Sequence, residues 1–319
     1  KTENLSQLNN NNNLTKLFLQ NCKINDWTLL LELNNLQLLY ISYSNISNLE
    51  HIPKQIKYLY LNSCLYIKDF STISSFTNLT ELSLENTYIT DITCVQNLKC
   101  LTNLSLYKCN HIKDFGSLYK LIQIEILDVG RTSITNTNYF NYCRNIKELY
   151  IEGCKHIIDF SYLSYLISLE TLNLGYSNIY DLTPISNLIN LTYLNLEWCK
   201  NITNYDIISK LYNLKTLRLN CSNVSDLSWI IPNQCLNNLD INYSKINDLS
   251  YIFKLHNLKK LILHLNYKLF SRFFLYLKKK NIINHIFIPS FLNNILYKLI
   301  STIFFNISSL LITSQQHIK

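Results

Sequence analysis

Two kinds of reactive side chain recur in this sequence at regular intervals. A cysteine returns every 45 residues, at Cys64, Cys109, Cys154 and Cys199. An aspartate follows an Ile-x or Val-x dipeptide eight times, at Asp26, Asp69, Asp91, Asp114, Asp159, Asp181, Asp226 and Asp248. Carboxylates are the ligands that calcium prefers, while thiolates bind zinc or pair as disulfides. Metal binding and disulfide formation therefore have to be weighed against a structural role.

The aspartates are best explained as caps of short helical turns. Each one is followed within a few residues by Ser, Thr or Gly-Ser and then by apolar residues. Asp, Ser and Thr side chains accept hydrogen bonds from the free N–H groups at the start of a helix. Thr183 followed by Pro184 also fits a helix start, because proline is favoured at the first helical position. We expect a structural role for these carboxylates.

The cysteines also fit a structural role. If each falls on one coil of a repeating fold, cysteines two coils apart lie about 10 Å from one another. A disulfide needs Cα atoms within roughly 7 Å, and a zinc site needs ligands that converge on one point. We therefore expect small buried thiols in a reducing compartment. His111 and His156 are also 45 residues apart, too far for a shared metal. No motif of a hydrolase, metalloprotease or nucleotide-binding enzyme occurs in the sequence. We expect no catalytic residue, metal or cofactor.

The spacing of these residues follows an internal repeat, L-x-x-L-x-L, which is clearest at 169–188. Twelve copies begin 20 to 23 residues apart, and copies with a ninth-position Cys alternate with copies that have Thr or Ser there. The starting residues are Leu14, Leu36, Ile56, Leu79, Leu101, Ile124, Ile146, Leu169, Leu191, Leu214, Leu236 and Leu258. Such a repeat predicts coils that bury their apolar edges against their neighbours.

The pattern resembles the leucine-rich-repeat family in its short 22-residue class, and the composition is similar in style to families of insect poxviruses or AT-rich protists. The resemblance covers residues 14 to about 266. It implies an α/β fold, an open solenoid of about twelve repeats with a parallel concave sheet and short 3₁₀ or helical segments on the convex side. The ninth position mostly carries Cys, Ser or Thr where the family usually has Asn.

Three regions are expected along the 319 residues: a polar, Asn-rich lead-in at 1–13, the solenoid at 14–267, and a basic, apolar segment at 268–319. The formal net charge is +8, but all 21 acidic residues lie at or before Asp248. The sequence contains no methionine, even at position 1, which indicates that the numbering starts inside a longer chain or after processing. The lead-in lacks the apolar segment of a signal peptide, so we expect a cytoplasmic protein.

The C-terminal segment has two interpretations. Apolar residues recur at helical spacing between 295 and 311, which favours a helical cap over the last coil. The alternative is a membrane-associating segment at 268–312, because 295–312 is nearly uncharged and Lys278 to Lys280 would attract anionic lipid.

The third, fifth and seventh residues of each copy are expected on the concave face, because side chains alternate along a strand. These positions hold seven acids and only three bases, and tyrosine is frequent among them. The candidate partner-binding residues are Tyr58, Tyr60, Glu81, Glu85, Tyr107, Asp128, Glu148, Tyr150, Glu152, Tyr193, Glu197, Trp198, Arg218 and Asp240. Tyrosine and tryptophan offer large, rigid contact area with a polar tip.

These features predict a monomeric, non-enzymatic scaffold that binds a protein partner with a basic patch on its concave face. A role in viral or parasite interaction with a host is one form this could take, and a membrane-tethered binding protein is the alternative. No small-molecule substrate is expected, and the acidic concave face disfavours nucleic acid.

Overall fold

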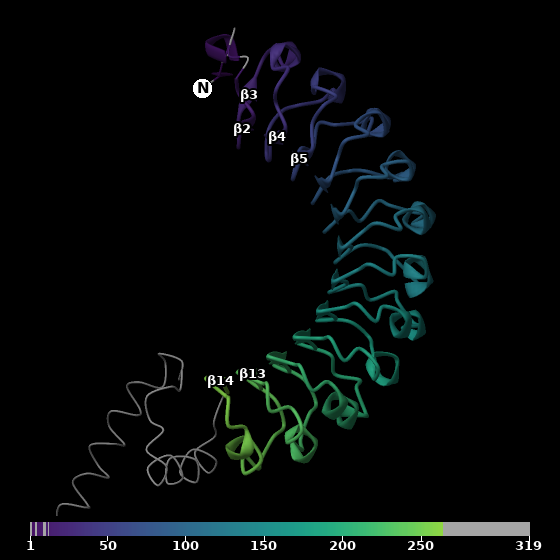
Figure 1. The fold of residues 1–319 in the computed structure, drawn as a ribbon, viewed down its shortest axis with the longest axis vertical. Coiled ribbons are helices and arrows are strands. Elements are labelled where there is room, and N and C mark those ends of the chain that lie inside the picture. The colour runs from purple at the N-terminus through teal and green to yellow at the C-terminus, as the bar shows by residue number, and fades with distance from the viewer. Residues whose placement is uncertain (1, 4, 9–10, 12, 264–319) are drawn as a thin grey trace, which may run out of the picture.

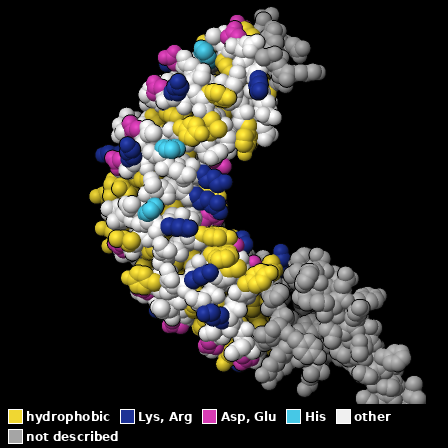
Figure 2. Space-filling view, turned by 180° about the vertical axis from the view of Figure 1, so that it is seen from behind, with side chains coloured by type: hydrophobic (Ala, Val, Ile, Leu, Met, Phe, Trp, Pro, Cys, Tyr) yellow, Lys and Arg dark blue, Asp and Glu magenta, His cyan; other side chains and the backbone are white. Residues whose placement is uncertain are grey.

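The computed structural model describes residues 2–3, 5–8, 11 and 13–263. They form an open, curved solenoid whose strands line the inner side and whose short helices line the outer side (Figure 1). The lateral face in Figure 2 lies between the concave hollow and the convex margin. The predicted leucine-rich-repeat architecture is confirmed.

Twelve parallel strands form one sheet in the order β14-β13-β12-β11-β10-β9-β8-β7-β6-β5-β4-β2. Their bounds are β2 Lys16–Phe18, β4 Leu38–Tyr40, β5 Tyr58–Tyr60, β6 Glu81–Ser83, β7 Asn103–Ser105, β8 Ile126–Asp128, β9 Glu148–Tyr150, β10 Thr171–Asn173, β11 Tyr193–Asn195, β12 Thr216–Arg218, β13 Asn238–Asp240 and β14 Lys260–Ile262. A second small sheet pairs β1 (Thr2–Glu3) with β3 (Lys23–Ile24).

The convex side consists of 3₁₀ helices in the described chain, because 22 or 23 residues per coil leave room for only a turn or two. They are η1 Leu5–Leu8, η2 Thr28–Glu32, η3 Leu49–His51, η4 Ser71–Ser75, η5 Thr93–Val95, η6 Gly116–Lys120, η7 Thr137–Phe140, η8 Ser161–Tyr165, η9 Thr183–Ile185, η10 Tyr205–Lys210, η11 Ser228–Ile230 and η12 Ile252–Lys254.

Every coil contributes the same kind of residue to one continuous core. The central residue of each of the twelve strands is a buried leucine, and the register pairs these leucines with one another, as Leu172 pairs with Leu149 and Leu194. Phe76 and Phe140 are fully buried between the sheet and the convex turns. In the lead-in, Leu5 of η1 is buried at the start of this core.

The aspartate column caps the convex turns, as predicted. All eight carboxylates accept a hydrogen bond from the backbone N–H two residues further on, at 2.8 to 3.0 Å. These bonds lower the pKa of Asp69, through the N–H and side chain of Ser71, and that of Asp181, through the hydroxyl and N–H of Thr183. The carboxylates therefore stabilise the turns in their ionised form.

The ninth-position residues are core residues that satisfy backbone groups between coils. The thiols of Cys64, Cys109, Cys154 and Cys199 are buried, and each donates to a carbonyl of the preceding coil at 3.0 to 3.1 Å. The Thr87 hydroxyl donates to the Leu84 carbonyl that also accepts from Cys109. Thr132 and Cys154 share the Val129 carbonyl in the same way.

Both predictions for the segment at 268–319, cap and membrane contact, concern residues outside those described. Among the residues that are described, no helix has the length and apolar character needed to cross a membrane.

Candidate functional site

The twelve strands arrange the third and fifth side chains of each coil in parallel rows on the concave face, and the seventh continues the surface where each strand ends. Since the register is unbroken from β2 to β14, equivalent residues lie side by side from coil to coil. None of the fourteen predicted binding residues is buried: Tyr58 and Trp198 are exposed and the others are partly exposed. The side chains predicted from the sequence to bind a partner are therefore accessible to solvent.

The N-terminal third of this surface is aromatic. The rings of Phe18 and Tyr40 lie 6.1 Å apart, and those of Tyr40 and Tyr60 lie 5.4 Å apart. Burial, together with the neighbouring Glu81 carboxylate, raises the pKa of Tyr60, so its hydroxyl stays protonated. This row presents flat ring surface and a hydrogen-bond donor.

The middle of the face is an acidic cluster centred on Glu152. Its carboxylate accepts hydrogen bonds from the Tyr107 hydroxyl at 3.3 Å and from the Asn173 amide at 2.7 Å. Arg131 Nε lies 3.5 Å from the same group. Glu152 is therefore held in place by three neighbouring coils.

Two further glutamates of the middle region have local donors. The Tyr150 hydroxyl donates to Glu148 at 2.6 Å, and the Ser105 hydroxyl donates to Glu85 at 3.0 Å. Burial and the Glu148 hydrogen bond raise the pKa of Tyr150. Both donors are uncharged hydroxyls, so neither of these hydrogen bonds pairs Glu85 or Glu148 with a cation.

Asp128 is the most strongly perturbed acid of the face. Burial raises its pKa to about 7, and the carboxylates of Glu85 and Glu152 act in the same direction. The hydrogen bond that its Oδ1 accepts from the Gly130 N–H at 2.8 Å opposes this shift. The charge on the centre of the concave face therefore changes near neutral pH.

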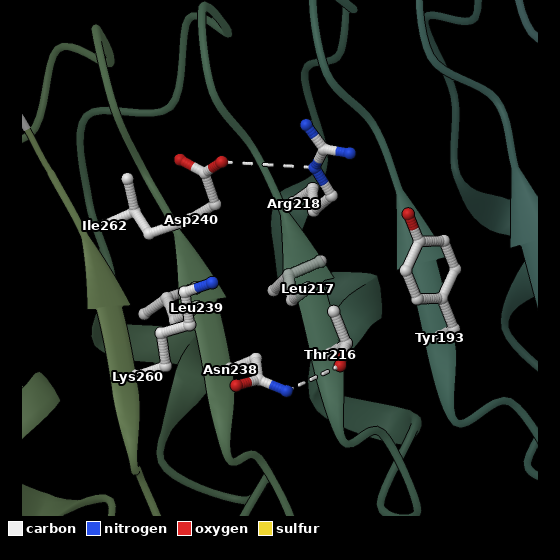
Figure 3. Close-up of a pocket in the computed structure, with 9 residues that line it drawn as sticks. All are labelled: Tyr193, Thr216, Leu217, Arg218, Asn238, Leu239, Asp240, Lys260 and Ile262. Atoms are coloured by element: carbon white, nitrogen blue, oxygen red, sulfur yellow. Dashed lines mark hydrogen bonds and ion pairs between the residues drawn. The ribbon is translucent and has the colours of Figure 1, made fainter. Parts of the chain in front are cut away.

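The C-terminal third holds a pocket of about 390 Å³ lined by residues of β11 to β14 (Figure 3). Arg218 reaches Glu197 at 2.7 Å and Asp240 at 3.9 Å, and the Asn238 amide donates to Thr216 at 3.2 Å. Burial also raises the pKa of Asp240. The acids that sequence reasoning offered to a partner here are largely paired with Arg218.

Trp198 lies apart from the rows of the sheet. It sits at the turn that leaves β11, in left-handed backbone with φ of 59°, where its ring stacks on that of Tyr176 at 5.8 Å. It therefore belongs to the lateral rim of the concave face.

Sequence reasoning missed Arg131 and Asn173, which hold Glu152. Asn173 occupies the fifth repeat position and could have been found by including amides among the candidates. Arg131 is at the eighth position, beyond the strand, and only the structure shows that it reaches back to the concave face. The fifth-position side chains of Asp128, Asn173, Asn195 and Asp240 also accept the N–H two residues on, at 2.8 to 3.1 Å.

The described residues contain no group of three or more His, Cys, Asp and Glu side chains able to hold a metal ion. Tyrosine, carboxylate and amide side chains are what the concave face offers, and these bind by hydrogen bonds, ring contacts and ion pairs.

A family model of leucine-rich repeats in two copies matches residues 77–120. Among solved structures, the chain is similar to internalin InlF of Listeria monocytogenes, with 25% identity over 79% of this chain and 74% of that one and a TM-score of 0.69. Internalin C2 of the same organism shares 27% identity over 60% of this chain and 84% of that one, with a TM-score of 0.56.

A third similar structure is the functional domain of InlJ from Listeria monocytogenes, which is described as including a cysteine ladder. It shares 22% identity over 83% of this chain and 61% of that one, with a TM-score of 0.57, and shows likeness of fold. The sequence matches no curated protein. The twelve-stranded solenoid, the repeats matched at 77–120 and the likeness to the internalins agree on a leucine-rich-repeat fold and support the leucine-rich-repeat family.

Proposed function

We propose that this protein is a non-enzymatic scaffold. Its acidic concave face binds a basic patch on the surface of a protein partner. Leucine-rich-repeat proteins generally serve protein–protein interaction. The observation that carries the proposal here is the acidic, tyrosine-rich middle of the concave sheet, where partly exposed Glu85, Glu148 and Glu152 lie within a few strands of one another.

The surface is suited to a protein rather than to a small molecule. It is a long, shallow, curved sheet, and its tyrosines and acids are distributed over many coils. Tyrosine side chains give interfaces much contact area at little entropic cost, and acids distributed among them select a partner of opposite charge. The hydrogen bonds to Glu148 and Glu152 hold both carboxylates in fixed positions, which reduces the ordering cost on binding.

The scaffold would work in a reducing compartment, as the cysteine chemistry suggests. Burial raises the pKa of Cys64 to about 11, and its thiol is already used as a hydrogen-bond donor in the core. A cytoplasmic location follows from this proposal.

Charge reversal on the concave face tests the proposal. Wild-type protein, a Glu148→Lys/Glu152→Lys variant and a Glu32→Lys/Glu170→Lys control would each be used as bait in quantitative affinity purification. The control reverses two exposed acids that lie off the concave face. We expect a partner that the wild type and the control retain and that the concave variant loses. A partner retained by all three proteins would contradict concave-face binding.

A further inference from the structure

The turns that leave the strands form a second surface, which the proposed function does not use. We define the turn edge as residues 21–25, 43–47, 63–68, 86–90, 108–113, 131–135, 153–158, 176–180, 198–203, 221–225 and 243–247. These segments contain no Asp or Glu. They carry eight Lys or Arg side chains, all exposed: Lys23, Lys68, Lys108, Lys113, Arg131, Lys155, Lys200 and Lys245. Seven of the eleven segments thus carry a cation, and they lie between the acidic concave face and the aspartates that cap the convex turns.

Exposed aromatic rings lie among these cations. Tyr43, Tyr66, Tyr88, Tyr176, Tyr180, Trp198 and Tyr243 are all on the turn edge and at least 38% exposed. The lateral face in Figure 2 shows such a mixture, with basic and hydrophobic side chains over its middle and acidic side chains mainly toward its margins. The opposite edge lacks this pattern: before the strands, Lys57 and Lys215 alternate with Glu125 and Glu170.

Backbone conformation gives no reason for large side chains at these turns. The eighth residue of eleven successive coils is in left-handed backbone, with φ between 52° and 67°. Gly and Asn adopt this conformation most readily, and Gly153, Asn21 and Asn86 do so here. Six other turns instead carry Tyr, Trp, Lys or Arg, whose side chains are exposed and fill no core. Neither backbone conformation nor core packing therefore explains why these turns carry large or charged side chains.

The rings and cations form local clusters that expose ring faces. The rings of Tyr176 and Trp198 are stacked at 5.8 Å with an angle of 15° between their planes, and Lys200 Nζ lies 4.4 Å from the Trp198 ring centre. Tyr88 and His111 meet edge to face at 5.5 Å. An aromatic platform beside a cation is how proteins bind single-stranded nucleic acid, since each base stacks and each phosphate pairs with a cation.

We propose that the turn edge binds single-stranded nucleic acid along the solenoid, through residues that lie beyond the strands of the concave face. With coils about 4.8 Å apart at the sheet, the eleven turns extend over about 50 Å, long enough for about ten nucleotides. The eight exposed cations of the turn edge favour a polyanion, and the stacked rings favour one with flat bases over an acidic peptide.

Binding would be measured with the full chain and fluorescein-labelled dT12 and U12 by anisotropy at several salt concentrations. The edge variant replaces one lysine with serine in each of three alternate coils, at Lys108, Lys155 and Lys200. A matched control removes three exposed lysines of the opposite edge, Lys57, Lys215 and Lys259. We expect the edge variant to reduce the slope of log K against log salt by about 2, since single strands give about 0.7 per phosphate contact. The control should bind like the wild type.

Stacking is tested separately by Trp198→Ala, with Tyr212→Ala as the control because Tyr212 is an exposed aromatic away from the turn edge. We expect Trp198→Ala to weaken binding by about tenfold and the control to have no effect. Failure of the oligonucleotides to bind, or equal loss in the edge and opposite-edge variants, would overturn the proposal. Equal competition by polyglutamate would replace nucleic acid with an acidic polypeptide, which also overturns it.

Discussion

Replacing Asp128 with asparagine tests how the acidic cluster of the concave face is held. We predict that Asp128→Asn stabilises the protein at pH 8 and has little effect near pH 4. The amide keeps an oxygen that can accept the Gly130 N–H, which now donates to Asp128 at 2.8 Å. Asn173 and Asn195 already perform this role at the same repeat position, so the substitution fits the coil. Only the charge is removed.

The magnitude follows from the proton affinity of the carboxylate. Burial raises the pKa of Asp128 from the usual 3.8 to about 7, so the folded state binds this proton more tightly than the unfolded state. Stability therefore falls as the pH rises from about 4 to about 7. At about 1.4 kcal/mol per tenfold change in affinity, the full effect is about 4 kcal/mol. Because the side chain is partly exposed, solvent screening reduces it, and we expect about 2 kcal/mol.

Urea denaturation at pH 4.5 and pH 8 would measure the free energy of unfolding of wild type and Asp128→Asn, with unchanged m-values as the check on comparability. Asp181→Asn is the opposite control. The hydroxyl and N–H of Thr183 lower the pKa of Asp181, so losing this charge should destabilise the protein at pH 8. A destabilised Asp128→Asn protein at pH 8, or an equal gain at both pH values, would refute the reasoning.

Three further predictions follow from the core, the caps and the thiols. Phe76→Ala should cost about 3 to 5 kcal/mol in urea denaturation because Phe76 is fully buried, whereas Ile122→Ala, at a 54% exposed site, should change stability by about 0.5 kcal/mol or less. Acidification below about pH 4 should lower the melting temperature, since hydrogen bonds depress the pKa of several capping aspartates and their protonation removes this stabilisation. Brief alkylation of the native protein, analysed by mass spectrometry, should modify the exposed Cys100 and Cys235 before the buried thiols, and uniform labelling would argue against the packing of the core.

The fold could be predicted from the sequence because each coil repeats the same constraints. A Leu at the centre of each strand, a small hydrogen-bonding residue at the ninth position and, in eight coils, an aspartate before the convex turn recur along the chain. A copy that departs from the pattern can therefore still be assigned from the other eleven copies. The cap role of the aspartates was predictable for the same reason, since Asp69 and Asp226 are followed by Ser in the same way.

The pairing of side chains on the concave face could not be predicted in this way, because it depends on which residue lies one or two coils away. Glu152 is held by Tyr107 and Asn173, which lie 45 residues before it and 21 residues after it. The repeat pattern places seven acids on this face, but two of them, Glu197 and Asp240, form ion pairs with the same Arg218. The acids that remain unpaired by a cation are concentrated in the middle coils.

The turn edge escaped sequence reasoning because an alternating strand pattern ends at the seventh residue. The left-handed turn at the eighth residue redirects the side chain from the concave face to the lateral rim, and Arg131 shows that the two surfaces meet there. Its Nε lies 3.5 Å from Glu152, while its guanidinium carbon lies 5.8 Å from the Tyr107 ring centre. A basic partner that takes Glu152 on the concave face would release Arg131 to a phosphate on the rim. Occupation of either proposed surface would then favour occupation of the other, and by linkage the effect must be equal in both directions.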